Sequence, residues 1–250
     1  MGGGSVKNRI MVKPIGLEEL FDLGPGKAPF PEIFTEVEYL WDVLGRIEGF
    51  AGRARPVVLA KEVTGAFLFG AVEVGEGTVI EPGAVIQGPV IIGRECQIRS
   101  GAYIRGPAII GDRVVVGHAS EVKNSLIHNE AEIPHFAYVG DSILGWRSHL
   151  GAGVKISNLK VTREPVTVRI TDQVYNTGLR KFGAIVGDEV EIGCNAVLNP
   201  GTILGRRSLA YALTSLSGYY PPESVIKLRQ RVEVVERREK KKKKEKEGSI

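Results

Sequence analysis

Three residues with acid, base or hydrogen-bonding side chains stand close together near the middle of the chain. The segment IPHFAYVGDSILGWRSHLGAGVKISN, residues 133–158, places His135, Tyr138 and Asp141 in an HxxYxGD arrangement. An imidazole takes up a proton at near-neutral pH, so His135 is a candidate general base. Taken alone, such a histidine is more often an ordinary solvent-facing side chain, and its neighbours must decide between the two interpretations.

Two basic residues form a second candidate feature. Arg105 and Lys123 each directly follow a branched aliphatic residue, Ile104 and Val122, at positions about 18 residues apart. If the fold stacks these positions, the two cations form a vertical ladder. The spacing alone is equally compatible with two solvated side chains and with a phosphate-binding site. Because stacked like charges repel each other when no anion lies between them, the phosphate-binding interpretation is slightly favoured.

A six-residue repeat supplies the elements that would position these side chains. From Leu68 to Val122 a branched aliphatic residue, or its substitute, recurs at every sixth position, often followed by glycine. After two five-residue steps and an interruption, the phase resumes from Val186 to Leu204. A helical period or a simple strand alternation fits this badly, whereas short strands separated by tight turns fit it well. The sequence therefore predicts a parallel β-helix whose aliphatic residues point inward.

The repeat also predicts which distant residues are neighbours. Three six-residue units close one triangular coil, so residues about 18 positions apart stack roughly 4.8 Å from each other. By this count Ser100, His118, His135 and Ala152 form one column.

Segments outside the repeat have other patterns. Residues 31–50 carry apolar residues at helical spacing behind Pro31, which predicts an amphipathic helix covering an open end of the solenoid. Residues 157–185 interrupt the repeat and predict a protruding loop or small hairpin. Apolar residues from Val225 to Val235 predict a C-terminal helix. The expected organisation is an N-terminal helical cap or linker at 1–66, a β-helix at 67–213, and a C-terminal helix with a lysine-rich tail at 214–250.

Charge and composition limit the possible partners. The net charge is +4, and the tail RREKKKKKEKE at 237–247 alone carries +5, so the basicity does not indicate a nucleic-acid-binding body. Cys96 and Cys194 form no CxxC pair, as a reducing compartment permits. No apolar run approaches the ~20 residues that span a bilayer, and the N-terminus lacks the apolar core of a signal peptide. We expect a soluble cytoplasmic protein without membrane or nucleic-acid partners.

Several motifs together resemble one family. HxxYxGD at 135–141, LGAG at 150–153, Asn158, and KFGAIVGD at 181–188 resemble the acetyltransferase half of the bacterial bifunctional N-acetylglucosamine-1-phosphate uridylyltransferase. They resemble more closely the archaeal sugar-1-phosphate nucleotidyltransferases that carry the same half. The resemblance covers about residues 67–213, and the nucleotidyltransferase half has no counterpart here. It implies a left-handed β-helix, a homotrimer with sites between adjacent subunits, and acetyl transfer from acetyl-CoA to the amine of glucosamine 1-phosphate.

The resemblance also implies roles for individual residues. His135 corresponds to the general base. The residues corresponding to substrate contacts are Arg105, Lys123, Tyr138, His149, Asn158 and Lys181, with the three cations around the sugar phosphate. Ala152, Cys194 and Ala212 correspond to positions lining the acetyl-CoA channel, where backbone amides would steady the developing oxyanion. His149, Val154 and Cys194 depart from the family residues, so the identity of the amino sugar stays open.

Two other functions remain as alternatives. The histidines His118, His128, His135 and His149 suggest a metal-dependent hydration enzyme, because γ-class carbonic anhydrases share this type of solenoid. Such sites need three converging imidazoles, and the spacing differs here, so we expect no metal. The other alternative is a non-catalytic trimeric partner of a separate nucleotidyltransferase.

Overall fold

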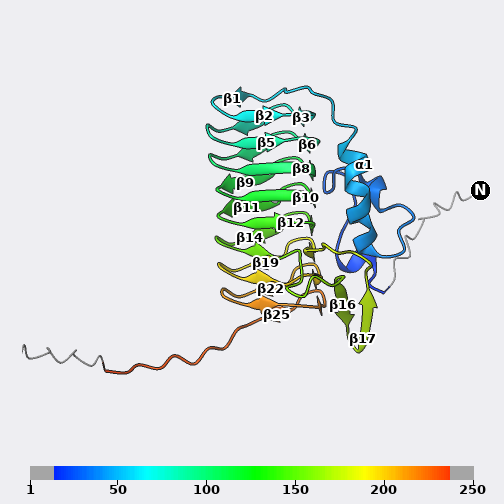
Figure 1. Cartoon of the computed structure of the whole chain (residues 1–250), viewed down its shortest axis with the longest axis vertical. Coiled ribbons are helices and arrows are strands. Elements are labelled where there is room, and N and C mark those ends of the chain that lie inside the picture. The colour runs from blue at the N-terminus through cyan, green and yellow to red at the C-terminus, as the bar shows by residue number, and fades with distance from the viewer. Residues whose placement is uncertain (1–13, 237–250) are drawn as a thin grey trace, which may run out of the picture.

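The computed structural model describes residues 14–236, and its main body is a parallel β-helix (Figure 1). Strands from successive coils stack in register along the axis of the solenoid and form three faces. The first face is a nine-stranded sheet. Its strands are β1 (Glu62–Val63), β4 (Val79–Ile80), β7 (Gln97–Ile98), β9 (Val115–His118), β11 (Glu132–His135), β14 (His149–Leu150), β19 (Glu191–Ile192), β22 (Leu209–Ala210) and β25 (Val225–Ile226).

The second and third faces belong to one 14-stranded sheet, because two long strands continue from one face to the next. These are β8 (Tyr103–Ile110) and β10 (Glu121–Ile127). The second face further contains β2 (Phe67–Phe69), β5 (Val85–Gln87), β12 (Tyr138–Gly140), β15 (Lys155–Ile156), β20 (Val197–Leu198) and β23 (Ser215–Leu216). The third further contains β3 (Val72–Val74), β6 (Val90–Ile92), β13 (Ile143–Leu144), β18 (Ala184–Val186), β21 (Thr202–Leu204) and β24 (Tyr219–Tyr220).

The six-residue phase predicted from the sequence matches the stacking of the coils. On the second face Ile86 pairs with Ile104, and Ile104 with Val122, and these residues are fully buried. The two five-residue steps, which end at Ile127 and Leu144, keep the phase, because both residues also lie in the interior core. The inward aliphatic residues therefore form one continuous core along the axis.

The third face is buried on both of its sides. Its outward-pointing residues include Ile109, Leu126 and Ile185, and they form a second core with the N-terminal segment. That segment contains the short helices η1 (Leu17–Glu19), η2 (Pro31–Phe34), η3 (Leu40–Arg46) and α1 (Ile47–Ala51). It runs along the flank of the solenoid, as Figure 1 shows, and not over an open end. The prediction of one helix over 31–50 that caps an end was therefore wrong in shape and in position.

The predicted interruption is present between β15 and β18, where residues 157–183 leave the solenoid and contain a two-stranded antiparallel hairpin, β16 (Thr167–Ile170) and β17 (Gln173–Asn176). Val166, Val168 and Ile170 join the second core, so the hairpin is anchored to the same flank as the N-terminal segment.

The predicted C-terminal helix is absent from the part of the chain that the structure describes. Val225 and Ile226 instead form β25, which pairs with β22 and extends the first face, and residues 227–236 have no regular secondary structure. β-branched residues such as Val225 favour a strand where a sheet edge is available. The lysine-rich tail at 237–247 lies outside the described residues. Among residues 14–236, no helix is long and apolar enough to cross a membrane.

Candidate functional site

The corner between the first and second faces carries the predicted histidine column. His118 and His135 are paired neighbours on β9 and β11. Backbone hydrogen bonds continue the same line downward: Gly153 N donates to His135 O at 3.0 Å, and Asn195 N donates to Ala152 O at 2.9 Å. A further bond joins Leu213 N to Cys194 O at 3.0 Å. The corner therefore stacks His135, Ala152, Cys194 and Ala212 in consecutive coils, about 4.8 Å apart.

The two histidines differ in their hydrogen bonds. His118 Nδ1 lies 2.6 Å from the carbonyl oxygen of Ser100, a contact that holds the proton on Nδ1 in the neutral ring. The ring of His118 also packs edge-on against Phe136, with centroids 5.3 Å apart. His135 is solvent-exposed at the end of β11 and lies beside the same phenylalanine. A ligand at this corner can therefore approach the imidazole of His135 directly.

A shallow groove of about 340 Å³ lies below His135 on this side of the solenoid. Its walls include Gly151, Gly193, Ala210 and Ala212, whose small side chains leave the backbone accessible, and the exposed Cys194. Two of the three predicted acetyl-CoA positions, Cys194 and Ala212, thus line one groove, and Ala152 directly follows its Gly151.

A hydrogen-bonded cluster surrounds the carboxylate of Asp141 on the neighbouring corner. Lys123 Nζ donates to Asp141 Oδ2 at 3.1 Å, and Asn124 Nδ2 donates to Oδ1 at 2.7 Å. Asn158 Nδ2 also donates to Asp141, and to the hydroxyl of Tyr138 at 3.2 Å. The structure thus brings together three of the predicted substrate residues, Lys123, Tyr138 and Asn158.

Gly140 makes this cluster possible. A Cβ at position 140 would lie 2.6 Å from the hydroxyl oxygen of Tyr138 and 2.9 Å from Nδ2 of Asn158. The space taken by these two polar groups therefore requires a glycine, which gives a physical reason for the Gly-Asp pair in the HxxYxGD motif.

Tyr138 keeps its proton in this environment. Partial burial, followed by the nearby carboxylates of Glu121 and Asp141, raises the pKa of Tyr138 above its ordinary value. Because its oxygen accepts the hydrogen bond from Asn158, the phenol can still donate its own proton to a ligand.

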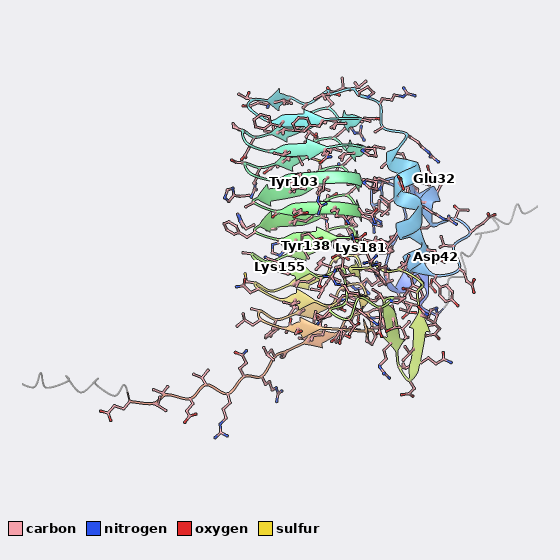
Figure 2. All side chains as sticks on the ribbon, viewed as in Figure 1. Glu32, Asp42, Tyr103, Tyr138, Lys155 and Lys181 are labelled. Carbon is pink, nitrogen blue, oxygen red and sulfur yellow. The ribbon has the colours of Figure 1, made fainter. Side chains whose placement is uncertain are left out.

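The predicted cations are only partly free to meet an anion. Arg105 stacks on Lys123 as expected, but its Nε donates to Glu121 Oε1 at 2.8 Å, while Lys123 pairs with Asp141. Lys181 precedes Phe182, whose backbone N–H donates to Asn158 O at 2.9 Å, so its backbone lies beside the cluster. Figure 2 shows Tyr138 and Lys181 on neighbouring parts of the solenoid.

The two remaining histidines lie apart from the column. His149 is on β14 of the first face, where its Nδ1 lies 3.0 Å from Glu191 Oε2, so a single chain does not bring it to the Asp141 cluster. His128 is fully buried beneath Phe21 and Phe34. The four histidines therefore do not converge, and no group of three or more His, Cys, Asp or Glu side chains that could hold a metal occurs within residues 14–236.

Sequence reasoning left two residues of this region without a role. Asp141 was visible in the HxxYxGD motif, but its position as the common acceptor of three side chains was not. Lys155 carried no signal: it pairs with Tyr138 across β12 and β15, and its Nζ donates to the carbonyl oxygens of Phe136 and Gly153. Figure 2 shows Lys155 with Tyr138 and Tyr103 on the same side of the solenoid.

Comparisons with known proteins identify the relatives of this chain. The family model of the GMPPB C-terminal domain matches residues 86–215. A bifunctional protein GlmU from Methanococcus maripaludis is 37% identical over 205 residues, which are 82% of this chain and 50% of that protein. A bifunctional sugar-1-phosphate nucleotidylyltransferase/acetyltransferase from Sulfurisphaera tokodaii is 36% identical over 96 residues, 38% of this chain and 24% of that protein.

Among solved structures, the UDP-N-acetylglucosamine acyltransferase of Francisella novicida has a TM-score of 0.51 at 15% identity, over 69% of this chain and 60% of that one. This likeness confirms the left-handed β-helix. The chain spans about half the length, or less, of the curated relatives described above.

Proposed function

Because this chain belongs to the GMPPB C-terminal domain family, we propose that it is an acetyltransferase that acts on a hexosamine 1-phosphate, with glucosamine 1-phosphate as the first candidate. Acetyl-CoA is the proposed acetyl donor and the N-acetyl sugar 1-phosphate the product. The names of the relatives, which include acetyl transfer and sugar 1-phosphates, support the reaction class.

One observation carries the proposal: a single corner of the solenoid places an exposed imidazole above a groove in which glycines and alanines alternate with larger side chains such as Leu209 and Tyr211. His135 lies one coil from Ala152 and two coils from Cys194, which lines the groove. The side chains of Gly151, Gly193 and Ala212 do not extend beyond Cβ, so this part of the groove fits a long, narrow group such as pantetheine. When bound there, acetyl-CoA would supply an activated thioester carbonyl.

The residues of the chain then have separate roles in the transfer. His135 takes a proton from the amine as its nitrogen bonds to the carbonyl carbon, and the imidazolium returns a proton to the sulfur when the C–S bond breaks. Tyr138 can donate its hydroxyl proton to a sugar oxygen. The amide of Asn158 already donates to Tyr138 and Asp141, so Asn158 contacts the sugar through its side-chain oxygen, which accepts a hydrogen bond from a hydroxyl group.

The phosphate lies toward Lys181 in this proposal. Arg105 and Lys123 keep their carboxylate partners Glu121 and Asp141, so they contribute a smaller net positive field than two free cations would. Of these three cations, Lys181 is the one without a carboxylate partner within residues 14–236, and it therefore supplies the unshared charge for the phosphate.

We further propose that the chain works as a homotrimer. His135 stands on an exposed corner, and Phe136, Tyr211 and Leu213 expose 54%, 46% and 54% of their surface along that same corner. A second copy packed there would cover these side chains and exclude water from the imidazole.

Release of free thiol from acetyl-CoA tests the reaction. Purified protein is given glucosamine 1-phosphate, galactosamine 1-phosphate or buffer in parallel. We expect thiol release with an amino sugar phosphate and background release in buffer. No release with either sugar, together with no acetyl-CoA binding by calorimetry, would contradict the proposal and favour a non-catalytic partner of a nucleotidyltransferase.

The role of His135 is tested by His135→Ala against His118→Ala. The two histidines stand in adjacent coils on the same corner, so they are a matched pair. We expect His135→Ala to lower kcat by at least about a hundredfold, with the same molecular mass as the wild type, and His118→Ala to keep most of the activity. Equal losses in both variants would remove the assignment of the base to His135.

A further inference from the structure

A second cavity lies between the inserted hairpin and the last coils of the solenoid, where Figure 1 shows β16 and β17 beside the lower strands. Its volume is about 450 Å³, within the range of sites for small molecules. It is lined by Lys160, Thr167, Arg169, Thr171, Val174, Pro200, Ser217, Gly218 and Tyr219. Neither His135 nor any residue of the Asp141 cluster lines it.

Strand alternation creates one wall of the cavity. In β16, Val168 and Ile170 point into the second core, so Thr167 and Arg169 point to the opposite side. Val174 of β17 pairs with Arg169 and lines the same cavity. The hairpin is thus amphipathic, and its polar side faces the cavity.

Two glycines allow the hairpin to approach the solenoid. A Cβ at Gly218 would lie 3.1 Å from Arg169 O, and a Cβ at Gly201 would lie 2.9 Å from Cγ1 of Val166. Both glycines have positive φ angles, of 75° and 82°. The cavity is therefore enclosed by a close backbone contact on one side.

The charge of the lining is positive. Lys160 and Arg169 are its charged residues, and no Asp or Glu lines it within residues 14–236. Lys160 Nζ donates to Thr167 Oγ1 at 3.0 Å, which leaves two of its three N–H groups for a ligand. The fork of Arg169 and the hydroxyl of Ser217 add further donors.

The opposite wall belongs to the solenoid and carries apolar groups beside Ser217. Pro200 and the ring of Tyr219 line it, while the Tyr219 hydroxyl donates to Glu19 Oε2 outside the lining. A ligand that fits both walls has an anionic group at one end and a flat or weakly polar body at the other.

We propose that this hairpin cavity binds a small phosphate monoester, with the phosphate between Lys160 and Arg169 and the body of the ligand against Tyr219. An arginine fork and an ammonium group that line the same cavity supply the donors and the charge that a phosphate requires. The cavity is larger than a bare phosphate needs, so binding of an organic phosphate is favoured. This site is separate from the proposed acetyltransferase site.

Calorimetric titration of the full chain with uridine monophosphate tests the proposal, because this probe joins a phosphate monoester to a flat ring. Inorganic phosphate and uridine serve as the two halves of the ligand. We expect uridine monophosphate to bind more tightly than either half, and Arg169→Gln and Lys160→Gln each to weaken it by at least tenfold.

Arg163→Gln is the matched control, because it removes the same charge from the same insertion at an exposed position outside the cavity. It should leave the affinity within twofold of the wild type, as should His135→Ala, which keeps this test independent of acetyl transfer. Affinities unchanged in Arg169→Gln and Lys160→Gln, or lowered equally in Arg163→Gln, would overturn the site.

Discussion

At the scale of single residues, the carboxylate of Asp141 holds the polar cluster together. Its side chain is 5% exposed, that of its partner Lys123 is 17% exposed, and Asn124 and Asn158 donate to the same carboxylate. A buried ion pair contributes little compared with apolar residues, but the loss of one partner leaves the other charge unpaired. Asp141 is therefore expected to position Lys123 and Asn158 and not merely to add charge.

Asp141→Asn removes the charge and keeps the shape. We expect a loss of about 2–3 kcal/mol in the free energy of unfolding, because the ammonium of Lys123 stays buried without its anion. Urea denaturation at a fixed protein concentration measures it. Glu223→Gln breaks an exposed pair with Arg207 and is the control, with a much smaller expected change. Equal losses would show that the cluster does not depend on this carboxylate.

The burial of His128 makes the stability of the folded chain depend on pH. Neither ring nitrogen has a hydrogen-bond partner among the described residues, and burial between Phe21 and Phe34 lowers its pKa to about 3. In the unfolded chain this imidazole titrates near its ordinary value of 6.5. As the pH falls below that value, the unfolded state binds a proton that the folded state excludes, so stability decreases toward low pH.

The change from pH 7 to pH 5 tests this linkage. We expect the wild type to lose about 2 kcal/mol from this histidine over that interval, and His128→Leu to lose correspondingly less. Unfolding free energies at the two pH values, each variant compared with itself, give the difference. His118→Gln is the control, and we expect it to keep the loss of the wild type. An identical decrease in His128→Leu would contradict the assignment.

At the scale of elements, the six-residue repeat predicted the strands of the solenoid better than the sequence pattern predicted the segments outside it. The inward residues follow from the six-residue period, but β6 and β18 also contain apolar residues that point outward, Ile91 and Ile185. Consecutive apolar residues are typical of a sheet buried on both faces. The six-residue period concerns only the inward residues, so it does not predict that the N-terminal segment covers the outer side of the third face.

Phe34 tests how much the flank contributes. It is fully buried in the second core, so Phe34→Ala is expected to cost about 3–4 kcal/mol through lost contacts and a cavity. Phe67→Ala is the control, because Phe67 is 56% exposed on the first coil. Denaturant unfolding compares the two. A small loss in Phe34→Ala would mean that the segment is held mainly by other contacts.

At the scale of the whole molecule, residues that are one coil apart in the sequence stack along the axis of the solenoid. The corners of the solenoid differ in the side chains that they carry. The period alone predicted the column from Ser100 to Ala152. The period also places Lys123, Asp141 and Asn158 in neighbouring coils, at separations of 18 and 17 residues, but it does not predict that their side chains turn toward one carboxylate in the space left by Gly140. At the corner between the third and first faces the charges are paired within the chain, since Arg113 and Arg147 both bind Glu130 and lower its pKa to about 2.

Among residues 14–236, the corner of His135 has no comparable network of ion pairs and instead exposes apolar side chains, which makes it the expected contact between copies. Phe136→Glu places a charge there, and burying that charge in a trimer interface would be costly. We expect the wild type to have three times the chain mass of 27.1 kDa by light scattering, and Phe136→Glu to have a lower mass. Val161→Glu is the control, because Val161 is 98% exposed on the insertion, and its mass should equal that of the wild type. An unchanged mass in Phe136→Glu would place the interface on another part of the solenoid.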